Sequence, residues 1–288
     1  MTDFPRMSEP SRPIPEIDMT RPSVARIYDY GMGGKDNFPV DREAALALAK
    51  ITPEMLDVAR ENRLFLYRAV RHLARDLGIK QFIDMGSGLP TSHNVHQVAQ
   101  EFQPDARVAY VDIDPIVLAH GRAILADNPG TTVITADMAR SDEILAQDEI
   151  RSLIDFSQPV GLLYFSVLHC LPDEADPRGA LWTMLEAVPS GSHLALSHLI
   201  SEDVAAGDAF TKGMLAMGPW GRVRRPAELH AFVEGLEPLE PGLIDITGWH
   251  PDPGQPPLPP VPEPLRPYLG RSDSAKNIWE MGGVLRKP

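Results

Sequence analysis

Residues 81–90 read QFIDMGSGLP, and this stretch decides the fold. It begins with a short apolar run, continues into a glycine turn at Gly86 and Gly88, and leads into a segment of helical length. Glycines after a buried strand let the backbone approach a ligand closely and direct that ligand towards the N-terminus of the next helix. The alternative interpretation is a tight strand-to-helix turn that binds nothing.

The same alternation of apolar runs and helix-length segments continues towards the C-terminus. The runs are RVAYVDI, TTVITA, VGLLYFSVL and SHLALSHLI, at residues 107–113, 131–136, 160–168 and 192–200. Strands that are apolar throughout and joined by crossover helices are typical of a parallel sheet covered on both faces. We therefore predict a Rossmann-like α/β fold, with helices that begin at Thr91, Pro115, Ser141 and Pro177.

Two more helices and two more strands complete the predicted pattern. The helices lie around 202–217 and from about Pro226, and the strands are GLIDITGW at 242–249 and NIWEMGGVL at 277–285. The connection 251–267 is rich in proline, which lacks the N–H that a helix interior or a central strand needs. We expect this connection to run extended over the surface.

The N-terminal part is predicted to form a helical cap. Residues 1–20 have no periodicity and are expected to be a mobile leader, whereas residues 21–79 are expected to be helical. In the longest helix, Thr52 caps the start, Pro53 occupies the first turn and Gly78 ends it. Its apolar stripe, which must pack on the sheet, consists of Leu56, Ala59, Leu66, Val70, Leu73 and Leu77. Residues 80–288 then form the sheet domain.

Three aspartates accompany the first three predicted strands. Asp84 lies beside the glycine turn, Asp112 ends the second strand and Asp137 follows the third. At the carboxyl ends of parallel strands, one carboxylate can accept both hydroxyl groups of a ribose, and another can meet an adenine amino group. A single aspartate of this kind is commonly a turn or capping residue, but three at the same edge predict a site for an adenosine-containing cofactor.

The spacing of the turn separates two kinds of adenosine cofactor. A dinucleotide fingerprint has a third glycine three residues after the second, where the helix packs closely beside a pyrophosphate. Thr91 occupies that position here, after Pro90. S-adenosylmethionine has no pyrophosphate and does not need this third glycine, so it is the predicted cofactor, and an NAD(P)-dependent reductase is the less favoured alternative.

Six stretches of the chain resemble one family. They are RPSVARIYDYGMGGKDNFPVDREA, ENRLFLYRAVRHLA, FIDMGSGLPTSHNVHQVAQ, YVDIDPIVLAHGRAIL, VLHCLPDEADP and GGVLRKP. They resemble, from about Pro22 to the C-terminus, the S-adenosyl methyltransferases that were long classed as a domain of unknown function. The resemblance implies a class I, Rossmann-like methyltransferase whose seven strands have the order 3-2-1-4-5-7-6, with strand 7 antiparallel. It also implies that S-adenosylmethionine is bound by Asp84, Gly86, Gly88, Asp112 and Asp137. Cys170 departs from the family pattern, in which an aromatic or aliphatic residue is expected, and this leaves the predicted cofactor unchanged.

A cover and an acceptor side are also predicted. Methyl transfer is an in-line displacement, so the protein mainly orients the partners and excludes water. The glycine-rich segment 28–38 is expected to close over the cofactor, although a helix-terminating loop is the alternative. His169 follows the fourth strand and is the predicted catalytic base, with pocket shaping as its alternative role. Cys170 is expected to point to the opposite side and to be a small core residue.

The predicted cofactor site is larger than the three aspartates. It comprises Tyr30, Asn37, Phe38, Arg63, Asp84, Gly86, Ser87, Gly88, Asp112, Ile113, Asp137, Met138 and Ser166. Arg63 interrupts the apolar stripe and either reaches the cofactor carboxylate or pairs with an acid while its stem packs. Trp220 and Arg222 are expected to border the acceptor pocket. His93 and His96 lack a third ligand in the sequence, so no metal is predicted.

Charge and composition limit the partners. The formal net charge of −13 repels nucleic-acid phosphates, and the basic cluster RVRR at 222–225 is short. A small-molecule acceptor is therefore predicted, and neither a nucleic acid nor a membrane is expected as a partner. A single cysteine and the lack of a signal-like N-terminal run predict a cytoplasmic protein. The sequence does not identify the acceptor or the oligomeric state. It also leaves open an alternative function, a non-catalytic sensor of S-adenosylmethionine or S-adenosylhomocysteine.

Overall fold

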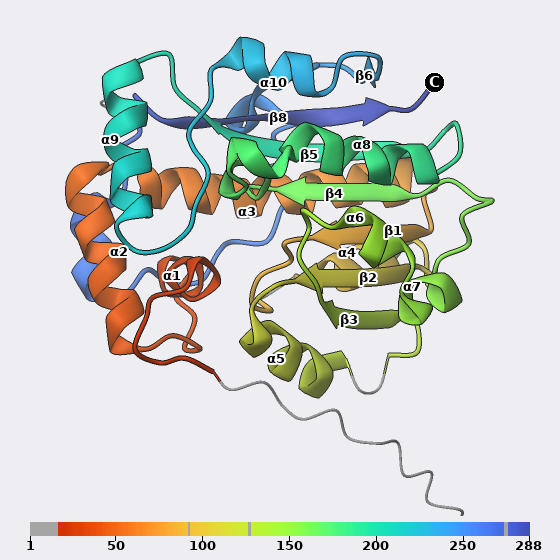
Figure 1. The fold of residues 1–288 in the computed structure, drawn as a ribbon, viewed down its shortest axis with the longest axis horizontal. Coiled ribbons are helices and arrows are strands. Elements are labelled where there is room, and N and C mark those ends of the chain that lie inside the picture. Colours follow the sequence, from red (N-terminus) through yellow and green to blue (C-terminus); the bar gives the residue numbers. More distant parts are fainter. Residues whose placement is uncertain (1–16, 92, 126–127, 274–275) are drawn as a thin grey trace, which may run out of the picture.

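The computed structural model describes residues 17–91, 93–125, 128–273 and 276–288. Most of the predicted leader, residues 1–16, lies outside the described residues, and residues 18–20 are exposed. The described chain forms one sheet with helices on both faces (Figure 1).

The sheet has eight strands in the order β3-β2-β1-β4-β5-β8-β6, and the short β7 also pairs with β8. The parallel strands are β1 (Gln81–Met85), β2 (Arg107–Asp112), β3 (Thr131–Thr135), β4 (Gly161–Phe165) and β5 (His193–Ile200). β8 (Trp279–Arg286) is antiparallel to β5, and it also pairs with β6 (Glu237–Pro238) and β7 (Ile244–Asp245). The predicted α/β class, the Rossmann-like strand order and the antiparallel closing strand are confirmed.

One predicted strand is shorter in the structure. The stretch 242–249 yields only the two-residue β7, and another two-residue strand, β6, precedes it. Pro241 lacks a ladder donor, and the Asp245 carboxylate accepts the N–H two residues further on at 3.0 Å, which starts a 3-10 turn over Ile246–Gly248. The sheet therefore has eight strands rather than seven.

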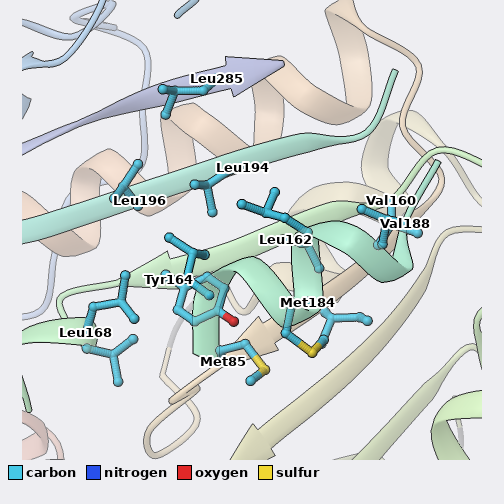
Figure 2. Close-up of a cluster of buried hydrophobic side chains, with 14 of the residues drawn as sticks. Met85, Val160, Leu162, Tyr164, Leu168, Met184, Val188, Leu194, Leu196 and Leu285 are labelled. Atoms are coloured by element: carbon cyan, nitrogen blue, oxygen red, sulfur yellow. The ribbon is translucent and has the colours of Figure 1, made fainter. Parts of the chain in front are cut away.

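Helices cover both faces of the sheet. One face carries α3 (Met55–Arg71), a π-helical turn (His72–Asp76), α4 (Val95–Phe102) and α5 (Pro115–Leu125). The other face carries α6 (Ser141–Leu145), α7 (Asp148–Leu153), α8 (Pro177–Ala187) and α10 (Pro226–Phe232). Buried apolar side chains fill both interfaces, and Figure 2 shows the second, where Met184 of α8 lies near Leu162 and Tyr164 of β4.

Three helices gather at one end of the sheet. α1 (Val24–Gly31), α2 (Pro39–Ile51) and α9 (Val204–Leu215) lie beyond the carboxyl ends of the parallel strands, at the end towards which the β4 arrow points in Figure 1. α3 instead packs on the sheet, where Phe65 is fully buried. The division into a cap, 21–79, and a sheet domain, 80–288, stays a prediction.

Several predicted helix ends can be compared with the structure. The starts that are confirmed are Pro115, Ser141 and Pro177. The helix expected from Thr91 begins at Val95, because the side chain of Gln97 accepts the Asn94 N–H at 2.8 Å and caps the helix there. Thr52 ends α2 rather than starting α3.

The proline-rich connection is more buried than predicted. It contains a 3-10 helix over Glu263–Tyr268, and Val261 and Leu265 are 5% and 2% exposed. Both side chains belong to an apolar cluster with residues of α1 and α2. The connection therefore packs against the N-terminal helices instead of crossing the surface passively.

A buried ion pair joins α1 to α2. Arg26 Nε lies 3.1 Å from Asp41 Oδ1 and 3.0 Å from Oδ2, and the side chains are 3% and 0% exposed. Asp41 also accepts the backbone N–H groups of Ser23 and Phe38, at 3.0 and 2.8 Å. These two residues precede the first turns of α1 and α2, so one carboxylate holds the starts of both helices.

We expect Asp41→Ala to lower the free energy of unfolding by about 3–5 kcal/mol, because the Arg26 guanidinium would stay buried without its partner. Glu43→Ala, at an exposed position of the same helix, is the matched control and should change stability by less than about 0.5 kcal/mol. Urea denaturation followed by circular dichroism measures both variants. Equal losses would contradict a structural role for the ion pair.

Candidate functional site

A cavity of about 620 Å³ opens at the carboxyl ends of the parallel strands. Its floor consists of the segments that follow β1, β2, β3 and β4, and its walls come from α1, α3 and the end of α9. Ligands of open α/β sheets bind at this edge, where the strand order reverses, and here the reversal falls between β1 and β4. The volume is in the range of sites for small-molecule ligands.

The glycine turn forms the centre of the floor. Gly86 and Gly88 have φ values of +68° and +66°, which side chains other than glycine rarely adopt. A Cβ on Gly86 would lie 2.1 Å from Cγ2 of Val167, whereas no atom lies within 4 Å of a Cβ built on Gly88. Gly86 therefore packs tightly against the segment after β4, and Gly88 faces open space beside the cavity.

Asp112 ties the glycine turn to the end of β2. Its Oδ2 accepts the Gly88 N–H at 2.8 Å, and its Oδ1 accepts the Asp114 N–H at 2.9 Å. Burial raises the pKa of Asp112, and these backbone hydrogen bonds oppose the rise. Because an ionised carboxylate has about four acceptor positions, Asp112 can hold the turn and still accept hydrogen bonds from a ligand.

Asp84 places a second buried carboxylate at this edge. Its side chain is 4% exposed, and burial raises its pKa to about 7, although the charge of Arg63 opposes that rise. Asp84, Arg63 and Ser87 line both the main cavity and a smaller adjoining one of about 30 Å³. The Oγ of Ser87 is buried and has no hydrogen-bond partner among the described residues. A ligand that carries a cation and hydrogen-bonding groups would satisfy this pair.

The structure brings ten of the thirteen predicted cofactor residues to the cavity. They are Arg63, Asp84, Gly86, Ser87, Gly88, Asp112, Ile113, Asp137, Met138 and Ser166. Asp137 Oδ1 accepts the Ala139 N–H at 2.9 Å, so this carboxylate also shapes its own turn. Ile113 is 65% exposed, which leaves an apolar side chain on the cavity side of the β2 end.

Tyr30, Asn37 and Phe38 are not brought to the cavity lining. Tyr30 is buried in the apolar cluster between α2 and the proline-rich connection. Asn37 Nδ2 donates to Asp29 Oδ2 at 2.7 Å, and the Arg26 guanidinium lies over the Phe38 ring, 5.2 Å from its centroid. Tyr28 and Asp29, the first residues of the predicted cover 28–38, do line the cavity, together with earlier residues of α1 and those just before it. Residues 30–38 instead join α1 to α2.

His169 and Cys170 occupy the reverse of their predicted positions. His169 is 3% exposed, does not line the cavity, and accepts the Leu199 N–H at Nδ1 at 3.2 Å. Burial lowers the pKa of His169 well below its ordinary value, so the ring is neutral. Cys170 lines the cavity instead. The chain forms a 3-10 turn over Leu168–Cys170, and the alternation that predicted the two directions holds only for an extended strand. This placement argues against His169 as the catalytic base.

Two polar residues that were not among the predicted contacts complete the wall near α3, and one of them, Tyr28, begins the predicted cover. Asn62 Nδ2 donates to Tyr28 Oη at 3.2 Å, and Tyr28 Oη donates to the Ala59 carbonyl at 2.7 Å. Asn62 is 3% exposed, and both residues line the cavity. The signal available in the sequence is a polar residue on the apolar stripe of α3, three positions after Ala59 and four before Leu66.

Part of the cavity wall is apolar. Met214 and Met217 at the end of α9 line it, together with Trp220, Leu66 and Cys170. Trp220 is 4% exposed, and its indole Nε1 has no hydrogen-bond partner among the described residues. The predicted place of Trp220 beside an acceptor pocket is compatible with this wall.

The basic cluster 222–225 is largely neutralised within the fold. Arg222 pairs with Asp173 at 2.8 Å and with Glu228 at 2.5 Å, and it does not line the cavity. Arg224 is 1% exposed and pairs with Asp173 at 2.6 Å. Two of its three arginines thus have acidic partners, which disfavours this cluster as a nucleic-acid contact.

His96, one of the two histidines considered as a metal ligand, is held by a hydrogen bond. Its Nδ1 lies 2.7 Å from Tyr110 Oη. Within the part of the chain that the structure describes, no group of three or more histidine, cysteine or acidic side chains could hold a metal ion. Over the same residues, no helix has the length and apolar character needed to cross a bilayer.

The chain is similar to a described protein family over almost its whole length. A family profile described as S-adenosyl methyltransferase matches residues 10–288. A solved structure of a Thermobifida fusca protein, provisionally described as a methyltransferase, is 38% identical with a TM-score of 0.82, and the match covers 94% of this chain and 96% of that one. A DUF574 family protein from Streptomyces avermitilis is 38% identical with a TM-score of 0.81, covering 95% and 100%. No curated protein matches the chain.

We expect Gly86→Ala to destabilise the protein more than Gly88→Ala. The positive φ costs an alanine about 1 kcal/mol at either position, but only at Gly86 would the new Cβ collide with Val167. Thermal unfolding of both variants measures the difference. Equal losses would show that the turn is not packed against Val167 as described.

Asp84 should make the stability of the ligand-free protein depend on pH. Because folding raises its pKa from 3.8 to about 7, the folded chain keeps a proton between these values that the unfolded chain has released. The stability contributed by this group therefore falls as the pH rises from about 4 to about 7. In urea unfolding, we expect Asp84→Asn to gain stability relative to the wild type across that range. A constant difference would contradict the raised pKa.

Proposed function

The chain belongs to the S-adenosyl methyltransferase family and so is a methyltransferase with S-adenosylmethionine as its cofactor, and from this premise we propose that it methylates a small molecule inside the cavity described above. The observation that carries the proposal is the continuity of the cavity from the aspartate-rich edge to the apolar wall of Met214, Met217 and Trp220. The aspartate-lined part has the chemistry for the donor, and the apolar part offers room for a small acceptor.

The polar end matches the groups of S-adenosylmethionine. Asp112 has free acceptor positions for the ribose hydroxyls, and Asp137 and Ile113 offer a carboxylate and an apolar surface for the adenine. Asp84 offers its buried carboxylate to the ammonium group, and the open side of Gly88 permits close approach. The remaining proposed contacts are Arg63, Gly86, Ser87, Met138 and Ser166.

The reaction requires alignment more than covalent chemistry from the chain. S-adenosylmethionine supplies a methyl group that its sulfonium activates, and the protein holds the acceptor for in-line attack and excludes water. The pair Tyr28 and Asn62 keeps α1 against α3 over the cavity. His169 has no part in this proposal, because it lies behind the wall.

Two alternatives are less well supported. A non-catalytic sensor needs only the donor site, whereas this cavity continues beyond it to the apolar wall. An NAD(P)-dependent reductase needs a turn that seats a pyrophosphate, and Thr91 occupies the position of the third glycine. A small-molecule acceptor agrees best with the apolar part of the cavity.

We expect Asp112→Ala to weaken S-adenosylmethionine binding by about tenfold or more, because the ribose and the Gly88 N–H both lose a charged acceptor. Calorimetry measures the affinity. With methyl-labelled S-adenosylmethionine and a cell extract as the source of acceptors, the wild type should place label in the small-molecule fraction, and Asp112→Ala should place much less there.

The matched control is Asp155→Ala, which removes an exposed aspartate of the segment that bonds to Gln81 at the opposite end of β1. It should leave both binding and labelling unchanged. Unchanged affinity in Asp112→Ala would contradict the proposed donor site. Label found only in protein or nucleic acid would contradict a small-molecule acceptor.

A further inference from the structure

A buried glutamate lies directly behind the cavity and has no place in the donor site proposed above. Glu280 on β8 is 2% exposed. The Ser166 hydroxyl donates to its Oε1, and its Oε2 is buried with no hydrogen-bond partner among the described residues. Ser166, just after β4, is itself a cavity residue, so the lining of the cavity is hydrogen-bonded directly to Glu280.

The backbone at Ser166 is held in an uncommon conformation. Its φ is +56°, in the left-handed region that a serine seldom occupies. The Ser166 N–H donates to Ser197 Oγ at 2.9 Å, and Ser197 Oγ donates to Asn62 Oδ1 at 2.6 Å. Strain of this kind is retained where the surroundings impose it, and it concentrates at functional sites. The strained serine turns its hydroxyl to Glu280 at the edge of the cavity.

Within the described part of the chain, the groups that shift the pKa of Glu280 include no cation. Tyr28 of α1 and Cys170 of the turn after β4 are the titratable groups that interact with it, and both are neutral at neutral pH. The Ser166 hydroxyl donates to Glu280, and the Ser197 hydroxyl, which donates to Asn62, lies nearby. Burial raises the pKa of Glu280 to about 7, and these hydroxyls oppose the rise. A buried carboxylate without a counter-ion is costly, and a cationic ligand in the cavity would supply one.

We propose that Glu280, acting through the Ser166 hydroxyl, is a positioning residue that makes the cavity prefer the sulfonium of S-adenosylmethionine to the uncharged thioether of the product, S-adenosylhomocysteine. The inference rests on the proposed donor site. A serine hydroxyl whose proton is held by a carboxylate presents an oxygen with increased negative charge to the cavity. Loss of the sulfonium charge on methyl transfer removes this attraction, so the product is released more readily than the donor.

The comparison of donor and product isolates this interaction. The two molecules share the adenosine, the ammonium and the carboxylate, and they differ in the methyl group and in the charge on sulfur. The groups that hold the shared parts, Asp84 and Asp112 among them, should affect both ligands alike. The ratio of the two affinities therefore reports the group that senses the sulfonium.

Calorimetric titration of the full chain at pH 7.5 with each of the two ligands is the test. We expect the wild type to bind S-adenosylmethionine more tightly, and Glu280→Gln to reduce the affinity ratio by about tenfold, the size of a partly screened charge interaction. Asp84→Asn should weaken both ligands and leave the ratio unchanged. Glu54→Gln is the matched control, because Glu54 is a glutamate 4% exposed that does not line the cavity. It should change neither affinity.

A second measurement follows the pH dependence of the affinity ratio. As the pH falls from 7.5 to 5.5, Glu280 gains a proton and loses its charge, so the wild-type preference for S-adenosylmethionine should fall several-fold. Because the pKa of Asp84 is also about 7, the same titration is repeated in Asp84→Asn, in which the pH-dependent ratio should persist. The two titrations together decide the matter if Glu280→Gln does not fold. A ratio that is independent of pH in the wild type, or unchanged in folded Glu280→Gln, would overturn the proposal. A ratio that changes only in Asp84→Asn would transfer the role to Asp84 and overturn it as well. Absence of binding of either ligand to the wild type would instead refute the proposed donor site.

Discussion

The hydrogen bond from the Gly88 N–H to the Asp112 carboxylate, at 2.8 Å, is the contact on which the candidate site depends. It joins the turn after β1 to the end of β2, so the two strand ends cannot separate without leaving a buried carboxylate unsatisfied. The positive φ of Gly86 brings the same turn against Val167 after β4. These two contacts fix the carboxyl ends of β1, β2 and β4 relative to one another. The cavity lies beside the ends that they hold in place.

Ionising the buried carboxyl groups at this edge of the sheet is energetically unfavourable without a ligand. Burial raises the pKa values of Asp84, Asp112 and Glu280, so each resists ionisation in the folded chain. Arg63 is the cation that acts on Asp84, and it opposes only part of that rise. The fold tolerates this cost because the apolar cores on both faces of the sheet are extensive. A cationic ligand with a ribose would relieve the cost, which is how a scaffold exchanges stability for binding.

The N-terminal helices form the wall because several distant contacts hold them there. Arg26 and Asp41 join α1 to α2, and the Ser23 hydroxyl donates to Asp114 Oδ2 at 2.5 Å across 91 residues of sequence. On their other side, the proline-rich connection packs its buried Leu265 against the same helices. Long-range contacts of this kind, rather than the glycine-rich joint between the helices, place α1 over the cavity.

The sequence alone determined the parallel sheet, the glycine turn and the three aspartates beside it, because these depend on local periodicity and on the rule that parallel strands end at one edge. It could not place His169 and Cys170, since their directions follow from a 3-10 turn that no periodicity indicates. Only the tertiary structure brought Glu280 to Ser166, 114 residues away, because antiparallel pairing with β5 places the start of β8 at the carboxyl edge of the sheet. Neighbouring residues along the chain determine local conformation. The chemistry of the cavity wall depends instead on which strands, distant in sequence, the tertiary fold pairs at the edge of the sheet.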